Sequence, residues 1–579
     1  MSLFDSASLV VTPNGYKENK LYSIKPTDGS GDLVVTRATS ATRVNSDGLI
    51  EVTPYNLLQR SEQFDNAYWS KLASSISANS ITSPNNTITA DKLIEDTSAS
   101  AHRFISTSFA TTSGTSYSVS IFLKRAEREY AYIRLNNSGG DIIAANINLL
   151  NGTVSQLIFG DITIVPYNND WYRVVATGTS ISTSNGSFEV RISNSPTYAN
   201  YTGDGTSGIY IWGAQLVTGT SAKEYFPTTD RLDVPRLDYS NGSCPSILVE
   251  PQRTNLVLRS EEFNLIWSQL NVTITANVTT APDGTSTADK LVENATNNQH
   301  RIDQTTTSAI GTNTFSVFAK KSERDSIWLR VGTSGAYFDL TNGTASGVIG
   351  VTASIENYGN GWYKCSIVRT STVANEVVRI NSAIGINGTY LGDGTSGLFI
   401  WGAQLEAGEN ATSYIPTTTA SVTRNADVIS KTGISSLIGQ TEGTVLCDIN
   451  LTKLSEGKGL FAIDNGTTNE YIALIRISTN IFRLRLKNSS GSAVTLINSI
   501  VINDARCKVG IAYKNGDYAM YVNGVLRGTS TNSTNYPTTT LTQFILSNAS
   551  YGQLNDSYNI SALWKTRLSN TELATLTTI

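Results

Sequence analysis

Two glycine-rich stretches of this 579-residue chain have the spacing of a phosphate-binding loop. GDGTSGIYIWGAQL begins at Gly203 and GDGTSGLFIWGAQL begins at Gly392, and the two agree at twelve of fourteen positions. Each opens with G-x-G-x-x-G, which in dinucleotide-binding folds follows a strand and begins a helix. Here an alternating, β-branched run follows Gly208, and Gly213 comes too early for a helix. The sequence therefore predicts a loop that enters a strand, and we expect no nucleotide site.

The aspartates of these stretches suggest a different chemistry. β-Sandwich modules often hold a loop with a calcium ion bound by oxygen ligands, which makes Asp204 and Asp393 candidate calcium ligands. The pattern contains few carboxylates, so calcium binding and a purely structural turn remain open alternatives. We expect no other cofactor, because the four cysteines lack CxxC spacing and only two histidines are present.

Those two histidines, His102 and His300, each precede an arginine, Arg103 or Arg301. A Ser-His-Asp or Cys-His mechanism would have to use one of them, and neither lies near a G-x-S-x-G nucleophile pattern. We interpret each histidine as a surface or sheet-edge residue that is hydrogen-bonded to a neighbouring strand. The functional alternative is a polar His-Arg pair on a glycan-binding face.

Paired carboxylates could instead perform glycoside hydrolysis, which needs two of them about 5–9.5 Å apart, one with a raised pKa. Four acidic positions recur in two parts of the chain, and each has an arginine or lysine within a few residues. This favours salt-bridged structural acids, so we predict no enzymatic activity. The pairs are Glu51 with Glu250, Glu62 with Glu261, Asp91 with Asp289, and Glu127 with Glu323.

Aromatic side chains on a β-sandwich can stack on sugar rings. Trp212 and Trp401 have apolar neighbours two residues earlier and are predicted to lie in the core. Two Trp-Tyr pairs follow polar turns instead. In a strand one residue of each pair faces in and the other out, and the outward one is a candidate sugar platform. The pairs are Trp171-Tyr172 and Trp362-Tyr363.

The elements that must position these residues are strands. Asn-Gly, the strongest short hairpin signal, occurs ten times, and two such turns fold Cys507–Gly528 into a predicted meander. Apolar alternation of period two recurs throughout. The exception is the C-terminus, where Ser569 and Glu572 form a capping box ahead of a short helix. We predict an all-β chain of several sandwiches.

The similarity extends far beyond the glycine-rich stretches. LIEVTPYNLLQRSEQF at Leu49 matches LVEPQRTNLVLRSEEF at Leu248, and further blocks match in order while the offset shrinks from 199 to 189. This pattern indicates a duplicated β domain with insertions in its loops. We predict three tandem jelly-roll domains after a short segment: residues 1–41, 42–231, 232–421 and 422–579.

The composition of the chain also limits which functional classes the protein can belong to. Charged residues are only 16% of the chain and the net charge is −4, so binding to nucleic acid has little electrostatic support. The first fourteen residues lack a cationic start followed by an apolar run, and no transmembrane run is found, so we expect neither a secretory signal nor membrane insertion.

The blocks ATRVNSDGLIE, SVFAKKSER, NGWYKCS and GLFIWGAQLEAG with SYIPTT resemble a module of tailed-bacteriophage virion proteins that looks like a carbohydrate-binding, galactose-binding-like jelly roll. This resemblance covers about residues 36–418 in two copies. Residues 443–579, with GIAYKNGDYAMYVNGVLRG, resemble a laminin-G-like or concanavalin-like jelly roll. The calcium-ligand acids of that family are not evident here.

The resemblance implies a bacteriophage structural protein, a head or tail fibre, that binds host-surface glycans and forms a homotrimer. Residues 1–41 would dock it onto other virion proteins, and the chain would assemble in the host cytoplasm and be exposed on the particle exterior. A capsular-polysaccharide depolymerase and a bacterial surface adhesin are the alternatives.

Overall fold

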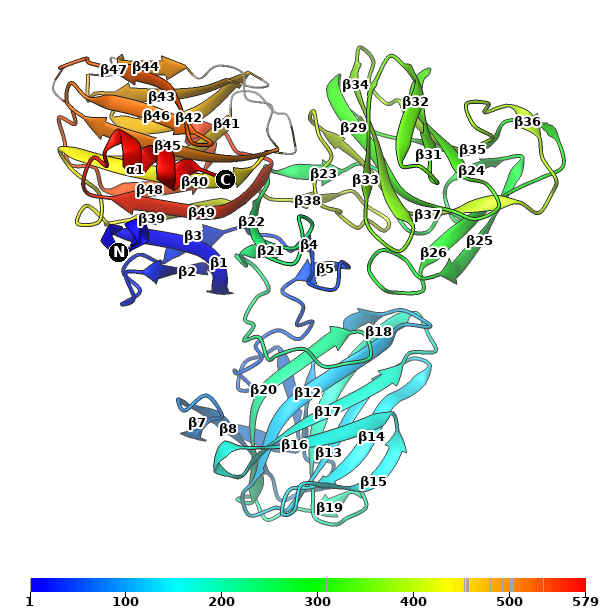
Figure 1. Cartoon of the computed structure of the whole chain (residues 1–579). Coiled ribbons are helices and arrows are strands. Elements are labelled where there is room, and N and C mark those ends of the chain that lie inside the picture. The colour runs from blue at the N-terminus through cyan, green and yellow to red at the C-terminus, as the bar shows by residue number, and fades with distance from the viewer. Residues whose placement is uncertain are drawn as a thin grey trace. The chain divides into compact units, whose positions relative to one another are not determined.

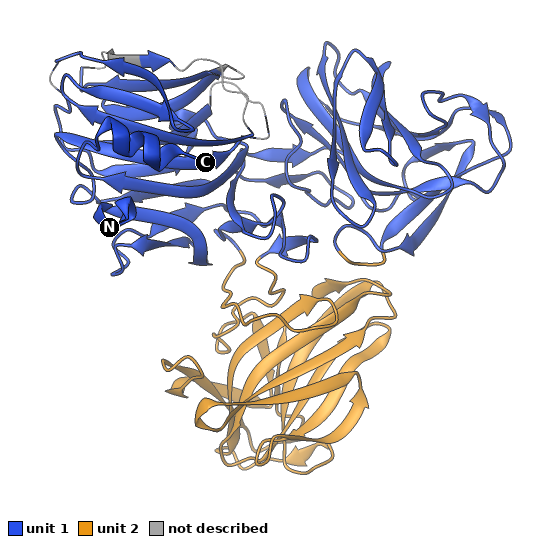
Figure 2. Cartoon of the chain, in the orientation of Figure 1, with its two compact units in different colours: residues 1–53, 232–283, 287–579 blue, residues 54–231, 284–286 orange. Residues whose placement is uncertain are grey.

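The computed structural model describes residues 2–308, 310–451, 453, 458–478, 481–490, 493–498, 505–534 and 536–579. Within these residues the chain is almost entirely β-structure, with a single α-helix, α1 (Asn570–Thr577) (Figure 1), which confirms the predicted all-β class. Figure 2 shows that the chain divides into two compact units, one of residues 54–231 and 284–286 and one of residues 1–53, 232–283 and 287–579.

The smaller unit is a sandwich of two antiparallel sheets. One has the order β15-β14-β13-β18-β10-β6, with β11 also paired to β18, and the other has the order β16-β17-β12-β20-β8-β7. The strands are β6 (Trp69–Leu72), β7 (Ser74–Thr82), β8 (Ile88–Glu95), β9 (Ala99–Ser100), β10 (Arg103–Ser106), β11 (Phe109–Thr111), β12 (Ser116–Arg125), β13 (Tyr130–Asn137), β14 (Gly140–Asn148), β15 (Thr153–Phe159), β16 (Asp161–Tyr167), β17 (Trp171–Thr179), β18 (Ser184–Ser193), β19 (Tyr201–Thr202) and β20 (Gly208–Thr218).

The second repeat has the same strand order, position by position. Its sheets are β32-β31-β30-β35-β28-β24 and β33-β34-β29-β37-β26-β25, so the sequence duplication is also a duplication of topology. The strands are β24 (Ser268–Leu270), β25 (Val272–Thr279), β26 (Ala288–Glu293), β27 (Asn297–Asn298), β28 (His300–Thr305), β29 (Gly311–Lys321), β30 (Ser326–Val331), β31 (Ser334–Asp339), β32 (Thr344–Ile349), β33 (Thr352–Asn357), β34 (Trp362–Ser371), β35 (Val377–Ala383), β36 (Tyr390–Leu391) and β37 (Gly397–Ala407).

The central strands of each repeat are buried on both faces. In β12, Val119, Ile121 and Leu123 belong to the core between the two sheets, whereas Phe122 packs on the opposite face against Trp212. Because side chains alternate along a strand, an almost continuous apolar run is what two buried faces require. Trp212 and its counterpart Trp401 are buried, which confirms the prediction made for them.

The C-terminal domain is built around a long, continuous antiparallel sheet. Its order is β44-β43-β42-β41-β48-β39-β3-β2-β1-β49-β40-β45-β46-β47, and β22 also pairs with β49. The strands are β1 (Leu9–Lys17), β2 (Lys20–Lys25), β3 (Leu33–Thr36), β21 (Arg236–Asp238), β22 (Ser246–Val249), β39 (Val428–Thr432), β40 (Glu442–Asn450), β41 (Lys458–Asp464), β42 (Tyr471–Ser478), β43 (Ile481–Lys487), β44 (Ala493–Asn498), β45 (Arg506–Lys514), β46 (Tyr518–Val522), β47 (Val525–Ser530), β48 (Gln543–Ser547) and β49 (Asp556–Trp564).

The N-terminal residues differ from the separate segment that the sequence suggested for residues 1–41. β1 pairs with β49 and β3 pairs with β39, so this segment fills the space between two strands of the C-terminal domain. Its alternating apolar residues, among them Leu9, Val11 and Leu33, enter the same core as the C-terminal strands. The following hairpin of β4 (Ala41–Val44) and β5 (Ile50–Thr53) also belongs to the larger unit.

Short connecting segments of the larger unit meet at a buried cluster of charges. Asp427 accepts hydrogen bonds from Arg37 (2.6 Å) and from Arg236, and Arg236 also bonds Glu250 (2.7 Å). Arg424 reaches the same glutamate at 2.7 Å. All five side chains are at most 1% exposed. Beside them, β23 (Arg253–Asn255) pairs with β38 (Val422–Arg424).

The predicted local signals at the C-terminus are confirmed. β45, β46 and β47 form the meander, and the turn between the last two has positive φ at Asn523 (51°) and Gly524 (79°), as its sequence requires. The Ser569–Glu572 capping box begins α1. Among the described residues, no helix is both long and apolar enough to cross a membrane.

Candidate functional site

In the first repeat, Asp204 of the glycine-rich stretch closes a tight turn with its own carboxylate. One oxygen accepts the backbone N–H groups of Thr206 (2.8 Å) and Ser207 (2.7 Å), and the other accepts the Ser207 hydroxyl (2.5 Å). Arg128 lies 3.2 Å from Asp204 and also forms a two-pronged pair with the buried Glu95. The guanidinium of Arg128 therefore supplies the positive charge beside the Asp204 carboxylate.

The second repeat reproduces this arrangement around Asp393, with Thr395, Ser396, Arg324 and Glu293 in the matching roles. Burial alone would raise the pKa of Glu293, but the hydrogen bonds from Arg324 and Tyr390 hold the pKa of this carboxyl below its usual value. The described residues contain no group of three or more His, Cys, Asp or Glu side chains arranged to hold a metal ion.

These contacts account for both aspartates without calcium, and they lead to a direct prediction. Adding calcium chloride, or removing divalent ions with EDTA, should leave the unfolding midpoint of the full chain unchanged. A site saturated at about 100 times its Kd would raise stability by about 2.7 kcal/mol, which thermal unfolding detects easily. A calcium-dependent rise that disappears in Asp204→Asn or Asp393→Asn would restore the metal interpretation.

The histidines lie elsewhere than the sequence suggested. His102 and His300 are both fully buried, so neither is a surface residue or part of an open binding face. The Nδ1 atom of His102 lies 2.6 Å from the carbonyl oxygen of Ala73, and its Nε2 atom lies 3.2 Å from that of Tyr201. His300 makes the same two types of contact. Each imidazole thus joins two backbone segments, which is a structural role.

The two Trp-Tyr pairs do not form open sugar platforms. Trp171 and Trp362 are buried, and their Nε1 atoms donate to backbone carbonyls. Tyr172 and Tyr363 are half-buried beneath glycine turns: a Cβ added at Gly152 would lie 2.2 Å from the Tyr172 ring. The alternation of β17 and β34 is as expected, but both sides of these strands are covered, so the outward residue is not free to stack.

Two of the four recurring acid pairs form the predicted salt bridges. Glu51, Glu250, Glu127 and Glu323 form salt bridges. The other two pairs, Glu62 with Glu261 and Asp91 with Asp289, accept hydrogen bonds instead. Glu62 and Asp91, which belong to the first repeat, line the same pocket. Glu62 accepts a hydrogen bond from the Tyr225 hydroxyl at 3.1 Å.

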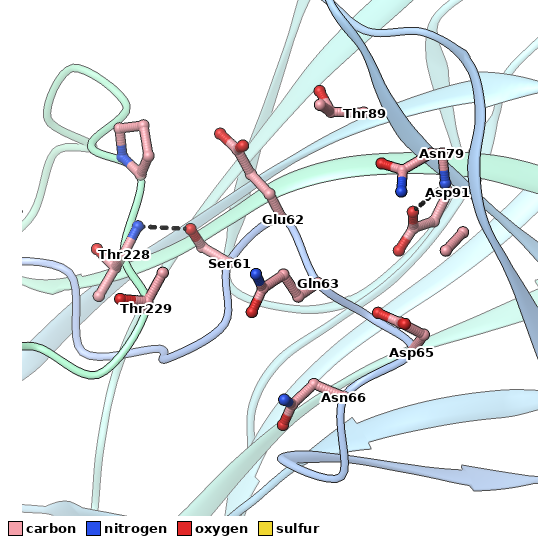
Figure 3. A pocket seen from close by; sticks show the side chains of 12 residues that line it. Ser61, Glu62, Gln63, Asp65, Asn66, Asn79, Thr89, Asp91, Thr228 and Thr229 are labelled. Atoms are coloured by element: carbon pink, nitrogen blue, oxygen red, sulfur yellow. Dashed lines mark hydrogen bonds between the residues drawn. The ribbon is translucent and has the colours of Figure 1, made fainter.

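That pocket is a polar hollow of about 430 Å³ in the first repeat (Figure 3). Three separate segments form it: the entry segment before β6, the strands β7 and β8, and the exit segment after β20. Hydroxyl, amide and carboxylate groups dominate its wall, which suits hydrogen bonding to a ligand rich in hydroxyl groups. Its lining residues are Ser61, Glu62, Gln63, Asp65, Asn66, Ala78, Asn79, Thr89, Asp91, Pro227, Thr228 and Thr229.

Asp91 fixes the shape of this pocket. One of its oxygens accepts the backbone N–H of Asn79 (2.9 Å) and the other that of Phe64 (3.0 Å), so it ties the entry segment to a bulge in β7. Asn79 has φ of 50°, a left-handed conformation that asparagine tolerates. Burial raises the pKa of Asp91 to about 6 despite both hydrogen bonds. Burial also raises the pKa of Glu62, and the negative charge of Asp91 adds a smaller effect in the same direction.

This raised pKa predicts a pH dependence of stability. Between about pH 4 and 6, native Asp91 holds a proton that the unfolded chain has released, so its contribution to the free energy of unfolding falls as the pH rises. Asp91→Asn should therefore gain stability relative to wild type over this range, measured by thermal unfolding of the full chain. Asn66→Ala, a pocket variant without a titratable group, is the control. A difference between Asp91→Asn and wild type that does not change with pH would contradict the prediction.

The second repeat has the same backbone framework as this pocket, but different side chains stand at the rim. Asp289 accepts the same two backbone N–H groups, from Asn277 and Phe263, and burial raises its pKa to about 6 as well. Asn264 and Leu265 stand where the first repeat has Asp65 and Asn66. The two copies therefore present different groups to a ligand.

Sequence reasoning named only Arg301 in another set of side chains, which lies on the outward face of the sheet that contains β30. We call it the arginine face and define it by Arg301, Trp328, Arg330, Arg379 and Asn381. Trp328 stacks on Tyr337 with ring centroids 4.8 Å apart and planes 8° apart. The available sequence signal was that Trp328 stands opposite Tyr132 in the repeat alignment.

The sequence matches no protein-family profile and no curated protein. Among solved structures, it is similar to the Ruminococcus gnavus IT-sialidase CBM40 bound to α2,3-sialyllactose, with 18% identity over 25% of this chain and 86% of that one, and a TM-score of 0.22. It is also similar to the receptor-binding domain of botulinum neurotoxin C/D mosaic serotype, with 14% identity over 26% and 40% of the two chains and a TM-score of 0.21.

Proposed function

We propose that this protein is a glycan-binding attachment protein on the exterior of a tailed-bacteriophage particle, a head or tail fibre assembled in the host cytoplasm. The observation that carries glycan binding is the 430 Å³ pocket of the first repeat, with its wall of hydroxyl, amide and carboxylate groups. The phage assignment is supported by the resemblance of the ordered sequence blocks alone. On this proposal the chain forms a homotrimer, and several weak sites act together through avidity.

Exposed residues of the N-terminal strands support a docking role for residues 1–41. Tyr22, Ile24 and Val34 are 36%, 45% and 45% exposed, so β2 and β3 present apolar side chains to a partner. On this proposal the partner is another virion protein. Light scattering of the purified chain tests the trimer, and locating the chain in images of the particle tests the docking.

Glycan binding is tested at the pocket itself. We expect the full chain to bind host-surface oligosaccharides on an array and to label host cells. Gln63→Ala combined with Asp65→Ala should weaken this binding about tenfold or more, because both side chains are exposed at the rim and removing them leaves the core intact. Glu224→Ala, an exposed carboxylate of the same unit outside the pocket, is the matched control. Unchanged binding by the rim variant would remove the pocket from the proposal.

Glycoside hydrolysis is a second candidate function, because Glu62 and Asp91 line the same pocket and burial raises the pKa of both. A carboxylic acid that keeps its proton near neutral pH can act as a general acid. Against this role, both Asp91 oxygens already accept backbone N–H groups. Release of reducing ends from host polysaccharide, abolished by Glu62→Gln, would make the protein a depolymerase.

A further inference from the structure

The arginine face of the second repeat carries more positive charge than its partners neutralise. Arg301 and Arg379 share a single carboxylate, Asp303, at 3.0 and 3.6 Å. Arg330 forms no hydrogen bond or ion pair with any described residue. Its guanidinium lies 4.4 Å from the centre of the Trp328 ring, a cation–π contact that holds it in place. Burial lowers the pKa of Arg330, and the charges of Arg379 and Arg301 lower it further.

Buried polar atoms beside this guanidinium also lack partners. Register places Arg301, Asn381 and Trp328 in one row across β28, β35 and β30, and Arg330 in the next row opposite Arg379. Asn381 is fully buried, and neither its amide nitrogen nor its amide oxygen has a hydrogen-bond partner. The Nε1 atom of Trp328 is unpaired as well. Buried donors without partners cost stability, so such a group of them points to a ligand that satisfies them.

On the same face of the first repeat, every arginine forms an ion pair with a carboxylate. The register places Glu189 where the second repeat has Arg379, and Arg191 where it has Asn381. Glu189 forms ion pairs with Arg103, Arg134 and Arg191. Arg134, the counterpart of Arg330, also binds Asp141 at 2.6 Å. The exchange of Glu189 for Arg379 thus replaces the central negative charge with a positive one.

We propose that the arginine face of the second repeat binds an oxyanion carried by a sugar, either a carboxylate or a phosphate, with Arg330 as its main charged partner. Arginine donates hydrogen bonds in a planar fork that matches both groups. The Nδ2 atom of Asn381 and the Nε1 atom of Trp328 are unpaired donors beside it, although both atoms are buried. This inference rests on the proposed glycan-binding function and narrows its ligand class: the second repeat selects acidic glycans and the first does not.

The test measures binding of the full chain to four probes by calorimetry: a glucuronate-containing trisaccharide, sialyllactose, glucose 6-phosphate, and neutral lactose. We expect binding to at least one charged probe, weakened by added salt, and none to lactose at this face. The two carboxylate probes and the phosphate probe distinguish the sources of the oxyanion.

Two variants assign the binding to this face. Arg330→Met should weaken the affinity for the charged probe about ten- to a hundredfold, while the unfolding midpoint stays the same or rises, because an unpaired and repelled cation is removed. Arg379→Glu introduces the residue type that the first repeat has at this position, Glu189, and should abolish binding because it places a negative charge opposite Arg330. Arg134→Met is the matched control: it leaves Asp141 and Glu189 with fewer partners, so it should lower the midpoint without changing the affinity.

The outcomes separate this inference from the proposed function. If Arg330→Met binds a charged probe like wild type, the arginine face is not the site and the inference is wrong. If neutral glycans bind and no charged probe does, the inference fails and glycan binding stands. If no glycan binds at all, on an array or in solution, both fail.

Discussion

Replacing Asp427 with alanine should destabilise the larger unit by about 3–5 kcal/mol, the cost of removing one partner from a buried ion pair. The carboxylate is 1% exposed and binds two arginines that are both completely buried. It also accepts the backbone N–H of Glu250 at 3.0 Å. Without it, Arg37 remains buried as a cation with no carboxylate partner among the described residues, and Arg236 keeps only its pair with Glu250. Chemical denaturation of the full chain measures the loss, and limited proteolysis should show faster cleavage at the connecting segments.

The control for this prediction is an exposed pair in the same unit. Glu442 lies 2.8 Å from Lys514, whose side chain is 55% exposed, so Glu442→Gln should cost less than about 1 kcal/mol. Combining Asp427→Ala with Arg37→Met should recover part of the loss, because the stranded charge is then removed. Equal effects of Asp427→Ala and Glu442→Gln would mean that the buried cluster contributes no more than a surface pair.

Local sequence signals predicted the elements well because each one depends on neighbouring residues. The Asn523-Gly524 turn and the Ser569–Glu572 capping box follow from backbone conformations that few residues tolerate, and both are present. The duplication gave the shared topology, because ordered blocks with a shrinking offset require the same strands with different loops.

Long-range pairing was not predictable in the same way. The N-terminal strands join strands more than 390 residues later, and an alternating apolar run does not specify which edge it will cover. A signal for the charge cluster was nevertheless present. Val-Thr-Arg or Val-Pro-Arg occurs at residues 35–37, 234–236 and 422–424, and the three arginines meet at Asp427 and Glu250.

The candidate site was only partly predictable for a related reason. Asp91 and Glu62 were recognised as recurring acids, but the pocket that they share needs three segments that are far apart in the chain. His102 looked exposed because histidine is usually a polar surface residue, whereas its ring here lies in the interior between two backbone carbonyl oxygens. Burial of a polar group depends on partners, which sequence spacing does not supply.

The glycines of GDGTSG should prove essential for packing rather than for binding phosphate. A Cβ added at Gly208 would lie 2.0 Å from the carbonyl oxygen of Leu93, and one added at Gly397 would lie 2.1 Å from that of Leu291. No side-chain rotation relieves a clash with backbone, so β20 would have to move away from β8. Gly208→Ala should therefore cost about 3 kcal/mol, the upper part of the usual range for overpacking, measured by thermal unfolding.

The comparison that tests this argument is a glycine with open space. Gly114 has φ of 80° and nothing within 4 Å of an added Cβ, so Gly114→Asn keeps a tolerated left-handed conformation and should cost less than about 1 kcal/mol. Gly397→Ala should behave like Gly208→Ala, because the two repeats share the contact. If Gly208→Ala is as mild as Gly114→Asn, close strand packing does not explain why this stretch recurs. If Gly208→Ala leaves stability intact but removes binding of a nucleotide, the phosphate interpretation of G-x-G-x-x-G returns.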